Sequence, residues 1–191
     1  MTVIDPSEIL FKLSAPSATA GNTVMGLPGV SLGNFISTIQ VSAIINNNIF
    51  SDITGAENAG NQVDYACIFI HNNTSTGNAM VNTIAWLPSA MVTPGGATLA
   101  MAADPAGISI LNSNTQQAAV ISAPTNPPAG VSGWVSPVSD IPVSPSYTGG
   151  LQLGTIQPGY TCAVWIRRTV ADVAALDSDT FEISVFFSSA G

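Results

Sequence analysis

The stretch QVDYACIFIHN, residues 62–72, decides the fold that the sequence predicts. Side chains of a β-strand point alternately to two faces, and here both faces are apolar. One face would carry Tyr65, Cys67, Phe69 and His71, and the other would carry Ala66, Ile68 and Ile70. A strand with two apolar faces is covered on both sides, so we expect a central strand inside the protein.

The same alternation recurs elsewhere in the chain. It is present in residues 36–45, 78–87, 159–168 and 180–187, and in a shorter piece at 8–13. The polar segment HNNTSTGN, residues 71–78, follows the central strand, so this strand and the next form a hairpin or a sheet corner. No amphipathic helix stands out. The sequence therefore predicts an all-β fold, an antiparallel β-sandwich of jelly-roll or immunoglobulin-like type.

Two regions are dominated by small residues and proline. Residues 1–35 have little to bury locally, so we expect an extended N-terminal arm that becomes ordered on a neighbouring molecule, or else a long surface loop. Residues 36–191 are expected to form a single β-sandwich domain. Within it, residues 88–150 are rich in Pro and Gly and predict long loops with short edge strands.

The chain is poor in charge. Only 7% of its 191 residues are Asp, Glu, Lys or Arg, compared with about 25% in an ordinary soluble domain. Lys and Arg number 3, Asp and Glu number 11, and the net charge is -8. Such a chain lacks the clustered cations that bind nucleic acid or an anionic membrane. A neutral surface of small residues instead favours lasting contacts with other protein, as in an assembly subunit.

The two cysteines, Cys67 and Cys162, both lie within apolar strand patterns. Because the chain shows no secretory signal, we expect synthesis in the cytoplasm and buried, reduced thiols. The alternative is a disulfide between sheets. Tyr65 and Tyr160 each precede a cysteine by two residues, as a tyrosine does in strand F of immunoglobulin domains.

Arg167 and Arg168 are the only adjacent cations, so these two guanidinium groups should have specific carboxylate partners. The partners are either the nearby Asp172, Asp177 and Asp179 or carboxylates of a neighbouring subunit. Loop-like sequence often carries binding residues, and it contains two aromatic candidates. The candidate interface residues are therefore Arg167, Arg168, Lys12, Trp134 and Tyr147.

The residues give no indication of catalysis. His71 is the sole histidine, and Cys67 lies on the same strand face at about 13 Å by strand rise, too far for a nucleophile–base hydrogen bond. Asp177 and Asp179, with Glu182, lack the turn glycine of a calcium loop and are interpreted as a hairpin tip. No phosphate-binding, dinucleotide or zinc pattern occurs. We expect a structural His71, no enzyme activity, no cofactor and no metal.

Four segments resemble a family of virion structural proteins of tailed bacteriophages. They are FKLSAPSATAG (11–21) with VSLGNFIS (30–37), NNNIFSDITGAENAGNQVDYACIFIHNNT (46–74), VNTIAWL (81–87), and LGTIQPGYTCAVWIRRTV (153–170) followed by DSDTFEISV (177–185). The similarity covers both ends of the chain and not the proline-rich middle. It implies a virion component without catalytic residues.

The resemblance and the composition together predict a capsid decoration or cement protein on the outer surface of the virion. Its partners would be the major capsid protein or other virion proteins, and it would form a small homo-oligomer without nucleic acid or membrane. Two alternatives stay open: a neck, tail or fibre-associated protein, and a carbohydrate- or receptor-binding β-sandwich module. The latter needs exposed aromatic side chains, for which Trp86, Trp134, Trp165 and Tyr147 are candidates.

Overall fold

The structure is a computed structural model that describes residues 4–17, 26, 29–42, 49–51, 55–75, 77–88, 97–110, 116–139, 149–170 and 181–190. In chain order the elements are η1 (Pro6–Glu8), β1 (Ile9–Ala15), β2 (Phe35–Gln40), α1 (Gly55–Ala59), β3 (Val63–Asn72), β4 (Ala79–Trp86), β5 (Ala97–Ile110), β6 (Leu151–Ile156), β7 (Tyr160–Val170) and β8 (Ser184–Ala190).

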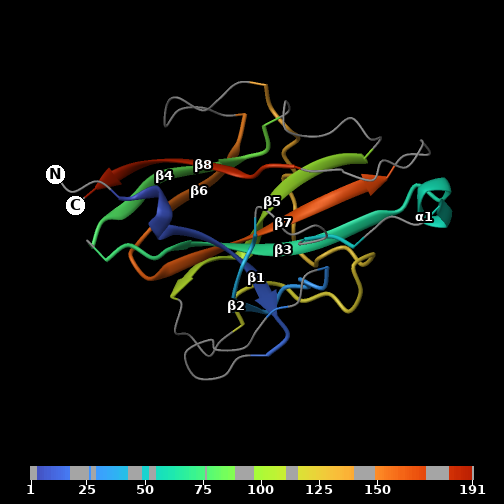
Figure 1. The fold of residues 1–191 in the computed structure, drawn as a ribbon, viewed down its shortest axis with the longest axis horizontal. Helices are drawn as coiled ribbons and strands as arrows, with labels where there is room; N and C mark the ends of the chain where they lie inside the picture. The colour runs from blue at the N-terminus through green and yellow to red at the C-terminus, as the bar shows by residue number, and fades with distance from the viewer. Residues whose placement is uncertain are drawn as a thin grey trace.

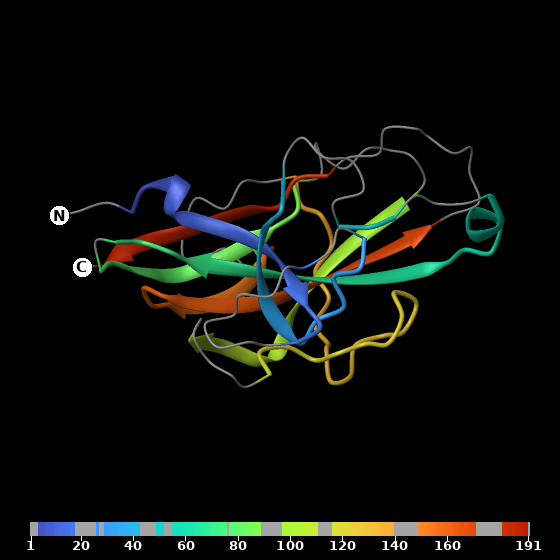
Figure 2. The same ribbon diagram turned by 60° about the horizontal axis from the view of Figure 1, so that its bottom comes forward.

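The strands form two antiparallel sheets (Figure 1). The larger sheet has five strands in the order β2-β1-β3-β7-β5, and the smaller has three in the order β6-β4-β8. The prediction of an all-β fold with antiparallel sheets, consistent with a β-sandwich, is confirmed. In the segment of residues 116–139, the yellow part lies on the side of the larger sheet away from β8 (Figures 1 and 2). Its orange end reaches the smaller sheet, where the N–H of Val138 donates to the carbonyl oxygen of Leu87 at 2.9 Å.

The predicted central strand is confirmed as β3, the middle strand of the larger sheet. Its Ala66, Ile68 and Ile70 belong to the apolar cluster between the two sheets, which we call the inner core. Its Cys67 and Phe69 belong to a second cluster beneath residues 116–139, which we call the outer core. Both faces of β3 are therefore covered by protein, as the two apolar faces of its sequence require.

The connection from β3 to β4 is a sheet corner, because the two strands belong to different sheets. The buried Asn72 holds this corner through its side-chain amide, which donates to the carbonyl oxygens of Asn78 at 3.1 Å and Ile156 at 2.9 Å. Its side-chain oxygen accepts from the backbone N–H of Thr74, as in an Asx turn.

Within the predicted N-terminal arm the structure describes β1, at the short strand that the alternation of residues 8–13 indicates. Residues 9–15 form a strand inside the larger sheet, paired with β3 from Ile9 opposite Asn72 to Leu13 opposite Ile68. The physical reason is apolar burial: Leu13 is completely buried, and Ile9 and Phe11 pack against the inner core. Residues 1–3, 18–25 and 27–28 of the predicted arm lie outside the described residues.

The predicted loop region 88–150 contains β5, an edge strand of the larger sheet that pairs with β7 and, at 14 residues, is longer than the short edge strands expected. Its alternation is carried by Ala, Leu and Met rather than by β-branched residues, so the strand signal is weak. Pro105 lies within it at an irregularity of the register between Ala103 and Ile108. Such a bulge on an edge strand is where a sheet tolerates proline.

Candidate interaction surface

Arg167 and Arg168 point to opposite faces of the larger sheet because they are neighbours on β7. The register of β7 against β3 places Arg167 opposite Tyr65 and Arg168 opposite Asp64. The predicted pair of cations is therefore divided between two environments.

Arg168 is neutralised within the chain. Its Nη2 lies 2.6 Å from Oδ2 of Asp64, and its Nη1 donates to the carbonyl oxygen of Ser51 at 3.0 Å. The guanidinium also lies over the ring of Phe50, 4.6 Å from its centroid. The carboxylate partner thus lies in the same chain but is Asp64; Asp172, Asp177 and Asp179 fall outside the described residues. Cross-strand pairing, rather than nearness in sequence, supplies this partner.

Arg167 lies over an aromatic ring. Its guanidinium carbon is 4.9 Å from the ring centroid of Trp134, and Trp134 packs at 5.8 Å and a 55° tilt against Tyr65. All three side chains are half-buried. Among the described residues no carboxylate is paired with Arg167. We call this group the Tyr65–Trp134–Arg167 cluster.

The segment that carries Trp134 is held to the larger sheet by backbone hydrogen bonds. Val135 exchanges two of them with Met101 of β5, at 2.9 and 2.8 Å, and the N–H of Tyr65 donates to the carbonyl oxygen of Pro124 at 2.7 Å. The cluster is therefore built on a rigid sheet and a segment fixed to it, rather than on a free loop.

Asp104 anchors the other end of this segment and is 3% exposed. Its Oδ2 accepts from the indole N–H of Trp165 at 2.7 Å and from the backbone N–H of Ala119 at 2.8 Å. Its Oδ1 accepts from the N–H of Ala106 at 2.8 Å. One buried carboxylate thus joins the bulge of β5, the strand β7 and the segment of residues 116–139, which we call the covering segment.

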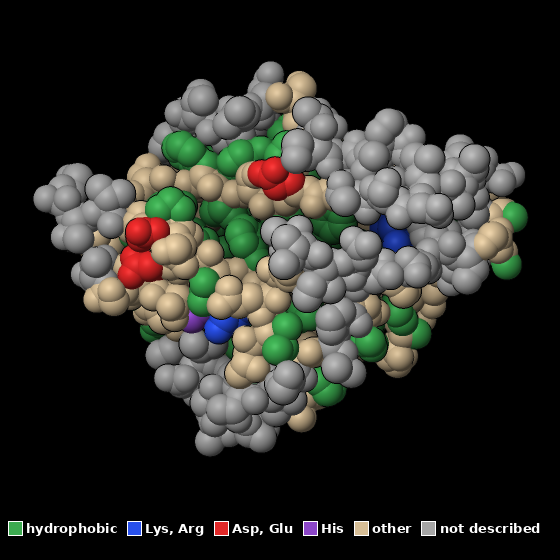
Figure 3. All heavy atoms as spheres, in the orientation of Figure 1, with side chains coloured by type: hydrophobic (Ala, Val, Ile, Leu, Met, Phe, Trp, Pro, Cys, Tyr) green, Lys and Arg blue, Asp and Glu red, His purple; other side chains and the backbone are tan. Residues whose placement is uncertain are grey.

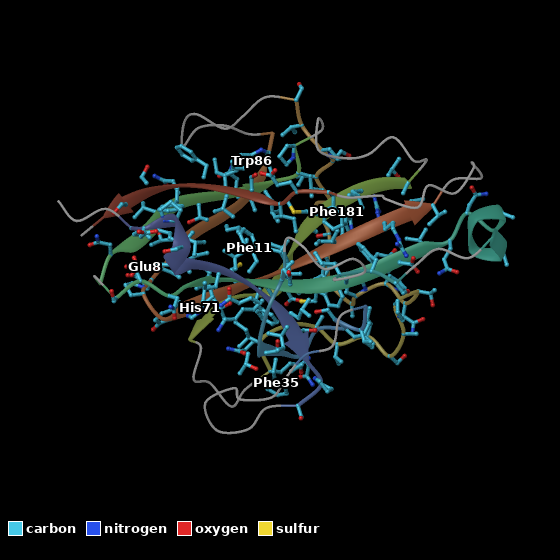
Figure 4. The ribbon with its side chains drawn as sticks, viewed as in Figure 1. Glu8, Phe11, Phe35, His71, Trp86 and Phe181 are labelled. Atoms are coloured by element: carbon cyan, nitrogen blue, oxygen red, sulfur yellow. The ribbon has the colours of Figure 1, made fainter. Side chains whose placement is uncertain are left out.

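Lys12 and His71 lie farther along the same face of the larger sheet. Lys12 is opposite Phe69 and His71 is opposite Leu10 in the pairing of β1 with β3. Figure 3 shows the single histidine beside a cationic side chain, and Figure 4 labels His71. Burial lowers the pKa of Lys12. The structure therefore places Lys12 apart from the cluster, and Tyr147 lies outside the described residues.

The two thiols are free and buried, as predicted. Cys67 belongs to the outer core and Cys162 to the inner core, so they lie on opposite faces of one sheet. The alternative of a disulfide between sheets is therefore wrong. Burial raises the pKa of Cys67 well above its ordinary value and that of Cys162 to about 12. Neither thiol has the lowered pKa of a reactive nucleophile.

The described residues contain no group of three His, Cys, Asp or Glu side chains that could hold a metal ion. They also contain no helix long and apolar enough to cross a membrane. The sequence interpretation missed Tyr65, Asp64 and Asp104 as partners of the candidate residues. Only the register of β3, β5 and β7 brings these residues together, and register was not deduced from the sequence. Comparison of the chain with protein-family models, curated proteins and solved structures finds no match.

Proposed function

We propose that this protein is a structural subunit that acts through lasting protein–protein contacts, and more specifically a decoration or cement protein on the outer capsid surface of a tailed bacteriophage. The single observation that carries the proposal is the environment of its three cationic side chains. Arg168 is paired with Asp64, Arg167 lies on Trp134, and Lys12 is half-buried. A surface with so little free positive charge suits contact with protein better than contact with phosphate.

The Tyr65–Trp134–Arg167 cluster supports a protein partner. Tyr, Trp and Arg are the residue types that most often dominate the energy of protein interfaces. Here all three are held in place before binding, which reduces the entropy lost on association. A guanidinium without a carboxylate partner among the described residues suits a carboxylate of the partner protein, bound through two parallel hydrogen bonds.

The position of the aromatic side chains disfavours a carbohydrate-binding module. Trp165 is completely buried and Trp86 is 8% exposed, so neither offers a face to a sugar ring. Trp134 is half-buried, with Arg167 over its ring and Tyr65 against it. The strongly buried thiols and His71 likewise give no support to an enzyme.

The specific assignment to a phage capsid rests on the sequence resemblance together with the low charge. A cement protein binds the assembled lattice and not its separate subunits, so it stabilises the lattice by mass action. Many modest contacts repeated by symmetry then give strong overall retention.

The test is the copy number of the protein in purified virions, measured by quantitative mass spectrometry against the major capsid protein. A decoration protein is expected on the order of hundreds of copies, because it follows the icosahedral repeat. About a dozen copies or fewer would move the protein to the neck, tail or fibres. Absence from virions would reject the virion assignment altogether.

A further inference from the structure

Among the described strands, the smaller sheet ends in an edge strand, β8, that is paired on one side only. β8 pairs with β4 on one side, and no other described strand pairs with it. Its sequence, SVFFSSA, contains neither a charged residue nor a proline, which are common means of protecting an edge strand. The backbone N–H and C=O groups along this edge are therefore suited to pairing with a further strand.

Beside this edge lie apolar side chains that the chain covers only in part. They come from β8, from the residues just before it, and from β1, and all pack against the inner core while remaining half-buried. The set consists of Phe181, Ile183, Val185, Phe187, Ile9 and Phe11. We call it the β8–β1 strip. Apolar atoms are visible in a hollow between these two strands in Figure 3, and Figure 4 labels Phe11 and Phe181 on the same side of the molecule.

The unequal size of the two sheets accounts for the strip. The smaller sheet has three strands and the larger sheet has five. β8 is the last strand of the smaller sheet on the side of β1. A strand added to β8 would lie about 4.8 Å beyond it and extend the smaller sheet over β1. Its alternate side chains would then cover Ile9 and Phe11.

The charges around the strip are negative. Glu182 is exposed and lies between Phe181 and Ile183, while Asp5 and Glu8 lie just before Ile9. Figure 3 shows acidic side chains at two places beside the hollow. Lys12, the cation nearest in sequence, points to the outer face of the larger sheet with Phe69. An occupant with cationic ends therefore matches the strip electrostatically.

We propose that the β8–β1 strip binds an extended segment of another protein, which has alternating apolar side chains and a Lys or Arg at each end and pairs with β8 as an added strand. This mode is β-strand addition, in which backbone hydrogen bonds give affinity and alternate side chains give specificity. A second copy of this chain is a poor occupant because Arg168 is paired with its own Asp64, Arg167 lies over its own Trp134, and Lys12 is half-buried. The inference rests on the proposed function in that it names a partner segment for the same structural subunit.

The test uses the full chain and a fluorescent peptide of alternating Val and Thr, about as long as β8, with Lys at both ends. Fluorescence anisotropy is expected to show saturable binding, and amide hydrogen exchange is expected to slow within Ser184–Ala190. The exposed Glu182 offers a substitution that leaves the core intact. Glu182→Lys should weaken binding several-fold and improve binding of the same peptide with Glu at both ends. Val120→Lys, at an exposed apolar residue outside the strip, is the matched control and should change neither affinity.

Three results would overturn the inference. One is equal binding of a peptide interrupted by proline, which cannot complete the strand ladder. Another is protection of amides elsewhere than in β8. The third is self-association of the free chain through β8, detected as a concentration-dependent mass, because it would make a second copy the occupant. Peptide binding by a chain that is absent from virions would instead reject the proposed function alone, and abundant virion copies without peptide binding would reject this inference alone.

Discussion

His71 is 1% exposed, and within the described part of the chain neither ring nitrogen has a hydrogen-bond partner. Burial, and secondarily the charge of Lys12, lowers the pKa of His71 from 6.5 to about 4. The neighbours opposite it, Leu10 on β1 and Thr161 on β7, carry no charge. The folded protein therefore excludes the charged imidazolium, whereas the unfolded chain accepts it.

This difference predicts an acid-dependent loss of stability. Because the folded pKa is the lower one, the contribution of His71 is fully present above about pH 6.5 and is lost as the pH falls toward about 4. The maximum slope for one linked proton is about 1.4 kcal/mol per pH unit. Urea unfolding at several pH values should show a shallower decline in His71→Leu than in the wild type. Identical declines in the two proteins would contradict the prediction.

Asp104 is the residue on which the outer core most depends. Asp104→Ala would leave the indole N–H of Trp165 and the N–H of Ala119 without their acceptor. Each buried donor left unsatisfied costs about 1–3 kcal/mol, so we expect a loss of about 2–5 kcal/mol in the free energy of unfolding. Glu182→Ala, which removes an exposed carboxylate bound to Ser184, is the control and should lie close to wild type. A loss no larger than that of the control would argue against the anchoring role.

At the scale of residues, the sequence identified the side chains that matter for the fold and the candidate site, but not the residues that they contact. The two cysteines were predicted to be buried, because their strands alternate clearly, and His71 was predicted to be structural. Asp64 and Asp104 were not expected as partners, because they lie 104 and 61 residues from Arg168 and Trp165. Such pairs depend on strand register, which the alternation of one strand does not determine.

At the scale of elements, the covering segment depends on a close approach at Gly33. Its φ is +87°, and a Cβ there would lie 1.9 Å from the carbonyl oxygen of Ala119 and 2.9 Å from Trp165. The neighbouring Asn34 donates its N–H to Ala119 and accepts from Gln117 and Ala118. A side chain at position 33 would therefore separate the covering segment from the larger sheet.

Gly33→Ala should thus destabilise the outer core well beyond the cost of an unfavourable φ. Gly77 is the matched control, since its φ is +81° and no atom would lie within 4 Å of an added Cβ. Gly77→Ala should cost about 1–2 kcal/mol, whereas Gly33→Ala should cost more and speed amide exchange at Asn34 and Ala118. Equal stability losses, with exchange at those amides unchanged, would show that the close approach does not matter.

Strands with a clear alternation of large apolar residues were predicted from the sequence, and strands with a weak alternation were missed or misplaced. β3, β4 and β7 have large apolar residues at alternate positions, and each was expected. β5 was missed over most of its length because small residues and Pro105 hide its alternation, and its stability comes from pairing with β7. β1 was expected as a short strand, but its place in the larger sheet was not, because partner choice is a property of the whole fold.

At the scale of the molecule, the two arginines lie on opposite faces of the larger sheet and have different roles. Arg168 stabilises the fold by neutralising Asp64, whose side chain is 5% exposed. Arg167, on the other face of the same strand, lies on Trp134 without an ion-pair partner among the described residues. Substitution of each arginine alone should therefore separate folding from assembly.

Arg168→Ala is expected to lower the free energy of unfolding by about 2–4 kcal/mol, because it leaves a buried carboxylate unpaired. Arg167→Ala should cost only about 1 kcal/mol, since a half-buried cation–π contact is lost and no ion pair among the described residues is broken. If the cluster binds a carboxylate of the capsid, Arg167→Ala should nevertheless reduce retention on purified virions, and more so at low salt than at high salt. Arg167→Lys keeps the charge but loses the planar fork, so it should restore retention only in part. Retention of Arg167→Ala equal to wild type at all salt concentrations would remove the cluster from the interface, whatever the copy number proves to be.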